Sequence, residues 1–147
     1  MRNGLIMDML EKAVALAVTA HQGQTDKANK PYILHPLRVM QRVSGMPARC
    51  AAVLHDVLED SDCTPADLRR AGISPRVIAA VQALTRRRGE SYAAFVRRAG
   101  RNPIARQVKI ADLEDNMDIR RLSRLTPQSV TRLKRYLAAW RQLSGVR

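Results

Sequence analysis

The residues best suited to acid–base and metal chemistry lie in one short segment of the chain. Between Leu54 and Asp60 the sequence holds a histidine, His55, and the carboxylates Asp56, Glu59 and Asp60. A continuous helix through this segment would stack His55 over Glu59 and the other two carboxylates in a second row. The neighbouring residues are apolar, so burying these charges is costly unless a cation compensates them. A solvated acidic helix end would explain Glu59 and Asp60 but not the His55-Asp56 step.

A second polar segment runs from Val108 to Met117. Asp112 and Asn116 are four residues apart and share one face of the helix predicted there. Taken alone, this pair fits an ordinary exposed helix surface, which tolerates both residue types. The two remaining histidines, His21 and His35, lie near predicted helix ends, where a lone histidine is usually structural. Acid–base or metal chemistry therefore requires the fold to bring several of these side chains close together.

The residue types in these segments are those of a catalytic metal site. Imidazole and carboxylate donors together suit a divalent transition ion such as Mn, Fe or Zn. Two histidines with two aspartates leave coordination positions for water and substrate. A cation held in this way lowers the pKa of a bound water and draws charge from a phosphoryl oxygen. Glu59 and Asp60 would then orient or deprotonate that water, provided that they lie beside the ion.

The elements that must position these residues are helices. Four helix starts carry a capping residue followed by proline at the first helical position, namely Thr64-Pro65, Ser74-Pro75, Asn102-Pro103 and Thr126-Pro127. Apolar residues between them recur with helical spacing, and no stretch alternates as a strand would. We therefore predict an all-α fold in one domain over residues 1–147, since a chain of this length builds one core. The predicted helices span residues 5–22, 36–44, 47–59, 65–71, 75–85, 91–99, 103–122 and 127–143.

The longest connection, from Gly23 to Pro31, is a predicted binding loop. It is polar and contains Lys27, and polar loops on a rigid scaffold often carry function. Tyr32, which follows the loop, could stack on a base or pack beside His35 as support. His21, at the end of the first helix, could contact a substrate phosphate or cap the last carbonyl groups of that helix.

Composition narrows the class of partner. Lys and Arg total 26 against 13 for Asp and Glu, a formal net charge of +13, which attracts polyanions or phosphorylated metabolites. Much of the basic charge lies between Arg86 and Arg141. Cys50 and Cys63 form no CxxC pair, and no N-terminal segment has the zones of a secretory signal. No apolar stretch approaches the roughly 20 residues that cross a bilayer, so we expect a cytoplasmic protein without membrane contact.

Four sequence blocks follow one another along residues 13–120. They are His21-Gln22-Gly23-Gln24 followed by Lys27, Pro31 to Leu37, Ala51 to Asp60, and Val108 to Asp112 followed by Asn116-Met117. In this order they resemble HD-domain phosphohydrolases, and among them the hydrolase domain of the RelA/SpoT-like alarmone enzymes and their small stand-alone relatives. The resemblance implies a compact helical HD-domain fold.

The resemblance also implies a metal site and a reaction. One divalent ion, most often Mn²⁺ with Fe, Zn and Mg as alternatives, would be held by His35, His55, Asp56 and Asp112. Glu59 and Asp60 would correspond to the carboxylate pair that positions the attacking water. The candidates for substrate contact are Lys27, Asn116, His21 and Tyr32. The implied reaction removes the 3′-pyrophosphate from a guanosine polyphosphate such as guanosine 3′,5′-bis(diphosphate), ppGpp.

Departures from the alarmone hydrolase pattern fall on substrate contacts. Asp26 stands where an Arg usually precedes the Lys, Ile119 occupies a usual Thr position, and Leu113-Glu114-Asp115 replaces an Arg-Leu-His type of interval. An acidic Asp26 near a polyphosphate is repulsive unless another cation offsets it. A different nucleotide or phosphoester is therefore an alternative substrate.

Two other functions compete with the metal-dependent phosphohydrolase. The Arg-rich second half favours a nucleic-acid-binding module, but few aromatic residues are available to stack on bases. The altered substrate contacts favour a nucleotide-binding protein that kept the metal site and lost turnover. The sequence predicts a phosphorylated nucleotide as the partner and leaves the oligomeric state undetermined.

Overall fold

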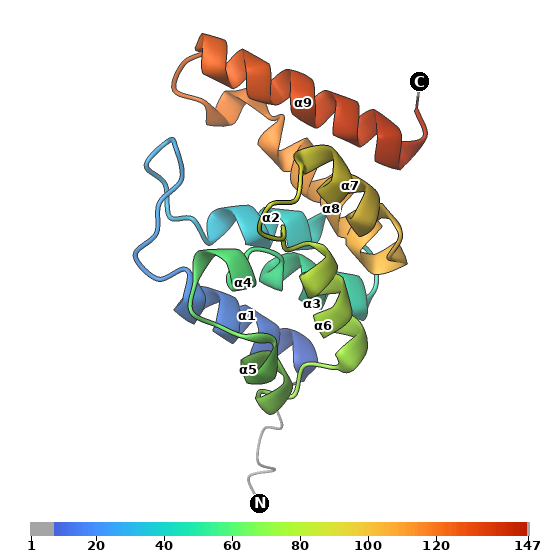
Figure 1. Ribbon diagram of the computed structural model, residues 1–147. Coiled ribbons are helices and arrows are strands. Elements are labelled where there is room, and N and C mark those ends of the chain that lie inside the picture. Colours follow the sequence, from blue (N-terminus) through green and yellow to red (C-terminus); the bar gives the residue numbers. More distant parts are fainter. Residues whose placement is uncertain (1–7, 147) are drawn as a thin grey trace, which may run out of the picture.

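The computed structural model describes residues 8–146 and confirms the all-α prediction (Figure 1). The helices are α1 (Met9–Ala20), α2 (Leu34–Gln41), α3 (Met46–Leu54), α4 (Val57–Asp60), α5 (Pro65–Arg70), α6 (Pro75–Ala83), α7 (Tyr92–Gly100), α8 (Pro103–Asn116) and α9 (Pro127–Ser144), with a 3₁₀ turn, η1 (Ile119–Arg121), before the last helix. In this part of the chain the only extended pairing is an isolated antiparallel bridge between Thr25 and Pro31.

The predicted helix starts are confirmed by their caps. The side chains of Thr64, Ser74, Asn102 and Thr126 each accept a hydrogen bond from the backbone N–H three residues later. Each bond satisfies an N–H group that has no partner inside the helix, and the proline that follows the cap has no N–H to lose. Asp8 caps α1 in the same way.

Helix α3 lies at the centre of the main hydrophobic core. It packs against α1, α2, α6 and α8, and Ala51, Ala52, Val53 and Leu54 are fully buried. Four consecutive buried residues mean that every face of this helix is covered. The point where α3 ends, and where His55 and Asp56 follow, is therefore held from all sides.

The predicted helix over residues 47–59 is interrupted, because α3 ends at Leu54 and α4 begins at Val57. The prediction that His55 stacks over Glu59 on one continuous helix was therefore wrong. At the break the His55 backbone N–H bonds to the Ala52 carbonyl, three residues back, and the His55 ring binds the same carbonyl oxygen. A side chain that takes a carbonyl oxygen in this way competes with the helical hydrogen-bond pattern.

Several other predicted helices differ at their ends, and the helix predicted over residues 36–44 spans Leu34–Gln41. The predicted helix over residues 103–122 ends at Asn116, and a 3₁₀ turn follows at Ile119–Arg121. Asp118 starts this turn by accepting a hydrogen bond from the Arg120 N–H. The first residues of the predicted helix over 5–22 lie outside the described residues, and α1 is described from Met9.

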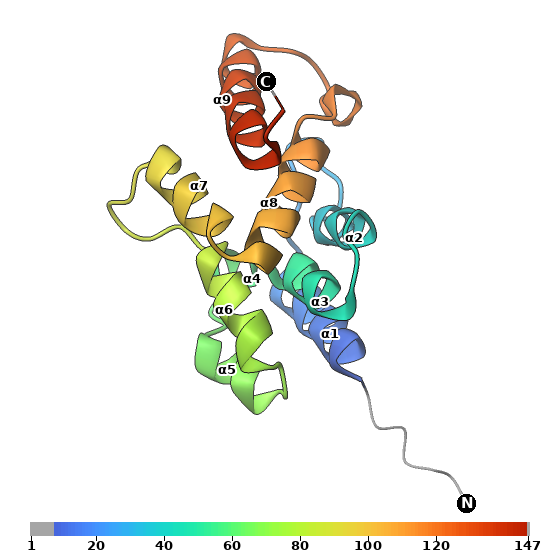
Figure 2. The same ribbon diagram turned by 90° about the vertical axis from the view of Figure 1, so that its right-hand side faces the viewer.

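A second, smaller cluster attaches α9 to the rest of the protein. Its buried members are Val96 of α7, Leu113 of α8, and Ala139 and Leu143 of α9. In Figures 1 and 2, α9 lies beside α7 and α8 and far from α1 and α5. The C-terminal helix therefore packs along α8 and α7 rather than on the main core.

The cysteines and the membrane prediction can also be compared with the structure. Cys50 and Cys63 are both free, and Cys50 is buried. Between residues 8 and 146, no helix combines the length and the apolar character needed to cross a bilayer.

We expect Leu143→Ala to lower the free energy of unfolding by about 2–5 kcal/mol, because Leu143 is 4% exposed and its removal leaves a cavity beneath α9. Leu137→Ala is the matched control, on the same helix at a position that is 40% exposed, and should change the free energy by less than about 1 kcal/mol. Urea unfolding followed by circular dichroism measures both. Equal effects would contradict the packing of α9 through Leu143.

Candidate metal centre and adjoining pocket

Four side chains that are distant in the sequence meet where α2, α8 and the α3–α4 break come together. His35 Nε2 is 3.0 Å from Asp112 Oδ1 and 3.8 Å from Asp56 Oδ2. His55 Nε2 is 3.0 Å from Asp56 Oδ2 and 3.4 Å from Asp112 Oδ1. Donor atoms of His35, His55 and Asp56 lie within 4.8 Å of one another, close enough for one metal ion. These three side chains could hold one ion, and Asp112, whose Oδ1 lies within 3.4 Å of both imidazole nitrogens, is the fourth candidate ligand.

The hydrogen bonds of His55 leave its Nε2 available to a cation. His55 Nδ1 is 2.6 Å from the Ala52 carbonyl oxygen, and because a carbonyl only accepts, Nδ1 carries the proton of the neutral ring. Nε2 is then an acceptor, in a side chain that is buried. Nothing within residues 8–146 forms a hydrogen bond of good geometry with it. A buried, unsatisfied imidazole nitrogen next to two carboxylates fits a divalent cation.

His35 is oriented by Asp115, a residue that the sequence analysis did not select. Asp115 is fully buried, and its Oδ2 lies 2.6 Å from His35 Nδ1. Arg38 Nε donates to Asp115 Oδ1 at 2.9 Å, and Arg121 Nη1 donates to Asp115 Oδ2 at 2.8 Å. An ionised carboxylate accepts only, so His35 Nδ1 carries a proton and Nε2 is turned toward Asp112. The spacing of three residues between Asp112 and Asp115 was the available signal, because it places both on one side of α8.

The neighbouring carboxylates control the protonation of both imidazoles. Burial by itself lowers the pKa of His55, but the charges of Asp56 and Asp112 raise it well above its usual value. Burial also lowers the pKa of His35, which hydrogen bonds with Asp112 and Asp115 raise. The site therefore demands positive charge, which a proton supplies in the metal-free protein and a metal ion supplies when it is bound.

Positive charge also holds the aspartates ionised inside the protein. Burial raises the pKa of Asp112, but Lys109 and the two imidazoles hold it well below the usual value. Lys109 Nζ donates to Asp112 Oδ2 at 2.8 Å, and Asn116 Nδ2 donates to Asp112 Oδ1 at 2.8 Å. Asp56 Oδ2 accepts a hydrogen bond from the Tyr32 hydroxyl at 2.5 Å. Lys109, Asn116 and Tyr32 therefore fix the orientation of the two carboxylates.

Glu59 and Asp60, the predicted water-positioning pair, lie on α4 directly after the site. Glu59 Oε1 accepts a hydrogen bond from the Arg86 backbone N–H at 2.5 Å, which ties α4 to the loop before α7. The Asp60 carbonyl oxygen accepts one from Gln24 Nε2 at 2.8 Å. Partial burial, and then the nearby charge of Asp56, raise the pKa of both carboxyl groups. A carboxylate with a raised pKa is a better proton acceptor.

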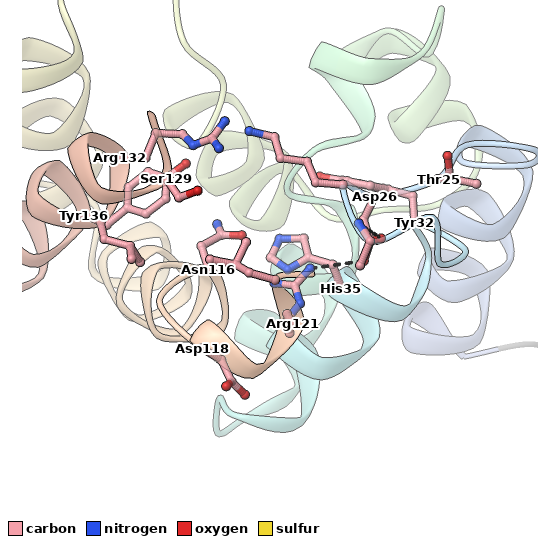
Figure 3. Close-up of a pocket in the computed structure, with 14 residues that line it drawn as sticks. Thr25, Asp26, Tyr32, His35, Asn116, Asp118, Arg121, Ser129, Arg132 and Tyr136 are labelled. Carbon is pink, nitrogen blue, oxygen red and sulfur yellow. Dashed lines mark hydrogen bonds and ion pairs between the residues drawn. The ribbon is translucent and has the colours of Figure 1, made fainter. Parts of the chain in front are cut away.

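A cavity of about 370 Å³ opens beside His35 (Figure 3). Its walls come from the loop before α2, the end of α8, the turn η1 and helix α9. The lining residues are Thr25, Asp26, Lys27, Ala28, Tyr32, His35, Asn116, Asp118, Arg121, Leu122, Ser129, Arg132, Leu133 and Tyr136. Of the predicted substrate contacts, Lys27, Tyr32 and Asn116 line this cavity.

The contribution of α9 to this cavity was not predicted. Ser129, Arg132, Leu133 and Tyr136 face it from one helix. Their spacing of three or four residues indicated one helical face, but the sequence did not indicate that this face would cover the binding loop.

His21 lies outside the residues that line the cavity. It caps the C-terminus of α1 and is 2% exposed. Its Nδ1 is 2.8 Å from Gln24 Oε1, and its ring centroid is 4.9 Å from that of Tyr32. These contacts connect His21 to the back of the site through Tyr32.

Asp26 is occupied within the binding loop. Its Oδ1 accepts hydrogen bonds from the backbone N–H groups of Ala28 and Lys30, both at 2.9 Å. Burial raises the pKa of Asp26, but these bonds and the charge of Arg121 lower it overall. The cation that the sequence analysis required beside Asp26 is thus present, 3.5 Å away on Arg121.

Comparison with known proteins shows which families and proteins have a similar sequence. A family model described as HD domain matches residues 13–139. A guanosine-3′,5′-bis(diphosphate) 3′-pyrophosphohydrolase of Aquifex aeolicus is 29% identical over 120 residues, which are 74% of this chain and 17% of that protein. One from Vibrio cholerae is 39% identical over 66 residues, 42% of this chain and 9% of that protein. The chain therefore spans less than a fifth of the length of these relatives.

A solved structure shows the same fold. It is that of a metazoan ortholog of SpoT that hydrolyzes ppGpp, and it superposes with a TM-score of 0.76 at 21% sequence identity. The match covers 93% of this chain and 85% of that one.

We expect Asp115→Asn to weaken binding of a divalent metal ion about 10- to 100-fold, because it removes the anion that orients His35. Glu114→Gln is the matched control, since it is the next residue on α8 and its amide oxygen can still accept from Trp140 Nε1. Calorimetric titration of the metal-free protein with MnCl₂ measures both. Equal Mn²⁺ affinity in the wild type and Asp115→Asn would contradict the orienting role.

We expect the pH dependence of stability to change sign when metal is added. The raised pKa values of His35 and His55 stabilise the metal-free protein below about pH 6.5, and this contribution is lost as the pH rises through the raised values. Mn²⁺ binds deprotonated rings, so its stabilisation should grow with pH. Thermal unfolding from about pH 6 to about pH 9, with EDTA or with Mn²⁺, measures both slopes. Parallel curves would contradict the predicted metal site.

Proposed function

The chain belongs to the HD-domain family, and from this we propose that it is a metal-dependent phosphohydrolase that acts on a phosphorylated nucleotide. The observation that carries the proposal is that the Nε2 atoms of His35 and His55 both lie within 3.8 Å of carboxylate oxygens of Asp56 and Asp112. His55 Nε2 is also buried and forms no hydrogen bond of good geometry among the described residues. In the metal-free protein the Asp56 carboxylate, 3.0 Å from this nitrogen, can pair only with a protonated ring, and a divalent cation would take the place of that proton.

The proposed ligands are His35, His55, Asp56 and Asp112, and the proposed ion is Mn²⁺. Mixed imidazole and carboxylate donors suit Mn, Fe and Zn, and of these ions Mn²⁺ is the one that carboxylate oxygens suit best. When bound, the ion would supply Lewis acidity toward a phosphoryl oxygen and toward a water. Tyr32 and Lys109 would hold the two carboxylate ligands in place through their bonds to Asp56 and Asp112.

We assign proton transfer to the α4 carboxylates. The pKa of Glu59 and of Asp60 is raised by burial and by Asp56, which suits a carboxylate that accepts a proton from an attacking water. The Arg86 N–H fixes one oxygen of Glu59 and leaves its second oxygen for that water. Asp60 carries no side-chain bond of this kind to the α6–α7 loop among the described residues, so Glu59 is the better-positioned candidate.

The cavity beside His35 is the proposed substrate site, and ppGpp is the proposed substrate. Lys27 would contact a phosphate, Asn116 would contact the nucleotide from the end of α8, and Tyr32 would pack beside it. A volume of about 370 Å³ falls in the range of small-molecule sites. The two relatives described above are named for hydrolysis of this nucleotide, which supports the choice of substrate.

We expect the Mn²⁺-loaded protein to release pyrophosphate from ppGpp, and EDTA to abolish the release until Mn²⁺ is restored. His55→Ala should lose at least about 100-fold in rate because it removes a metal ligand, and Glu59→Gln should lose about 10²- to 10⁴-fold if Glu59 accepts the proton. Asp62→Asn, two residues beyond Asp60, is the control and should keep the wild-type rate. Release is measured on ppGpp, pppGpp, nucleoside mono- and triphosphates and dinucleotides.

Each outcome of this experiment decides between the alternatives. Loss of activity in His55→Ala alone would remove Glu59 from the mechanism. Wild-type rates in both variants would assign the activity to a contaminant. Tight binding of ppGpp without release would indicate a protein that kept the site and lost turnover. Salt-sensitive binding of nucleic acid that EDTA leaves unchanged would favour the nucleic-acid-binding alternative.

A further inference from the structure

Arg121 connects the binding loop to the residue that orients a proposed metal ligand. It lies on η1, and its side chain is 22% exposed on the cavity wall (Figure 3). One nitrogen, Nη1, donates to Asp115 Oδ2 at 2.8 Å and to the Asp115 carbonyl oxygen at 3.0 Å. The other, Nη2, is 3.5 Å from Asp26 Oδ2. The guanidinium is therefore fixed at one end and loosely partnered at the other.

The partner at the loose end has most of its own bonds elsewhere. Asp26 Oδ1 accepts from the N–H groups of Ala28 and Lys30, which hold the loop in shape. Only Oδ2 faces Arg121, at a separation longer than an ordinary hydrogen bond. A phosphate oxygen near Nη2 could therefore take a short, charge-assisted bond without breaking the bonds that shape the loop.

The remaining charges around the cavity favour an anion there. Lys27 and Arg132 also line the wall. The second carboxylate of the wall, Asp118, is bound by Arg120 at 2.8 Å. The lining therefore has more positive than negative charge, with Arg121 as its most firmly held cation.

We propose that Arg121 is a specificity-determining residue that binds a substrate phosphate through Nη2, displacing Asp26 Oδ2 from that nitrogen. This inference rests on the proposed function for the identity of the substrate. Arg121 and His35 are held by the same carboxylate, Asp115, so the phosphate-binding nitrogen has a fixed position relative to the metal centre. Such a site selects nucleotides that carry a second phosphate group apart from the one that reacts.

The experiment measures ppGpp binding without turnover, by calorimetry on metal-free protein in EDTA. We expect Arg121→Gln to weaken binding about 10- to 100-fold, the range that a hydrogen bond between charged groups provides. The matched control is Arg124→Gln, which removes the same charge from an exposed position outside the cavity lining and should change the affinity by less than about threefold. Circular dichroism verifies that each variant is folded.

Asp26→Asn gives a second measurement with an opposite expected sign. The amide oxygen of Asn can still accept from Ala28 and Lys30, while the charge that competes for Arg121 is removed. We expect ppGpp to bind about two- to fivefold more tightly. If the Asp26–Arg121 contact only holds the loop in place, Asp26→Asn will weaken binding instead, and that result would overturn the proposal.

Metal affinity separates this role from a purely structural one. If Arg121 acts only by supporting Asp115, Arg121→Gln will weaken Mn²⁺ binding as much as ppGpp binding, which contradicts the inference. If the wild-type protein binds ppGpp but does not hydrolyse it with Mn²⁺, that result would contradict the proposed function but not the proposed role of Arg121. If the wild type hydrolyses ppGpp, and Arg121→Gln and Arg124→Gln bind ppGpp equally well, the results would contradict only the proposed role of Arg121. A wild type that does not bind ppGpp would overturn both.

Discussion

The structure depends on cationic groups that compensate the negative charges of three aspartates in and beside the helical core. Asp112 and Asp115 are buried on α8, and Asp56 is close to them at the α3–α4 break. Carboxylates in such surroundings are very costly unless cations and donors surround them. Lys109 and the imidazoles supply this charge to Asp112, and three arginines, Arg38, Arg42 and Arg121, supply it to Asp115. The point between the imidazoles is left for one more cation, and this is the chemical basis of the proposed reaction.

The break between α3 and α4 places the His55 imidazole beside Asp56 and Asp112, and these groups together form the proposed metal site. Because α3 is buried on every face, its last residues have no freedom to move toward solvent. His55 leaves the helical pattern by binding the Ala52 carbonyl, and its Nε2 then points to Asp56 and Asp112. The same break starts α4, which carries Glu59 and Asp60 close enough to Asp56 for its charge to raise the pKa of both. A continuous helix would have put these carboxylates a full turn beyond the histidine.

Much of the basic charge of the chain is used within the fold. Arg98 donates to Glu90, to the Ala83 carbonyl oxygen at the end of α6 and to the Thr85 carbonyl oxygen just after it. Arg106 donates to the Leu143 carbonyl oxygen at the end of α9. Arg121 serves Asp115 and faces the cavity. Part of the net charge of +13 therefore stabilises the fold. Arginines bonded in this way fit a protein with a small-nucleotide site better than one with a continuous surface for nucleic acid.

The sequence alone was enough to predict the helical fold and the helix starts, and its resemblance to HD-domain phosphohydrolases selected His35, His55, Asp56 and Asp112 as the proposed ligands. Capping residues before proline, apolar spacing and the sequence blocks are local signals. They can therefore be recognised in the sequence without the three-dimensional structure. Tertiary structure alone decided the break at His55, the role of Asp115 and the closure of the cavity by α9. Each of these depends on a partner far along the chain: Asp115 lies 80 residues from His35, and no local pattern in the sequence encodes such a distance. Packing brings these groups together, and only there do their charges become coupled.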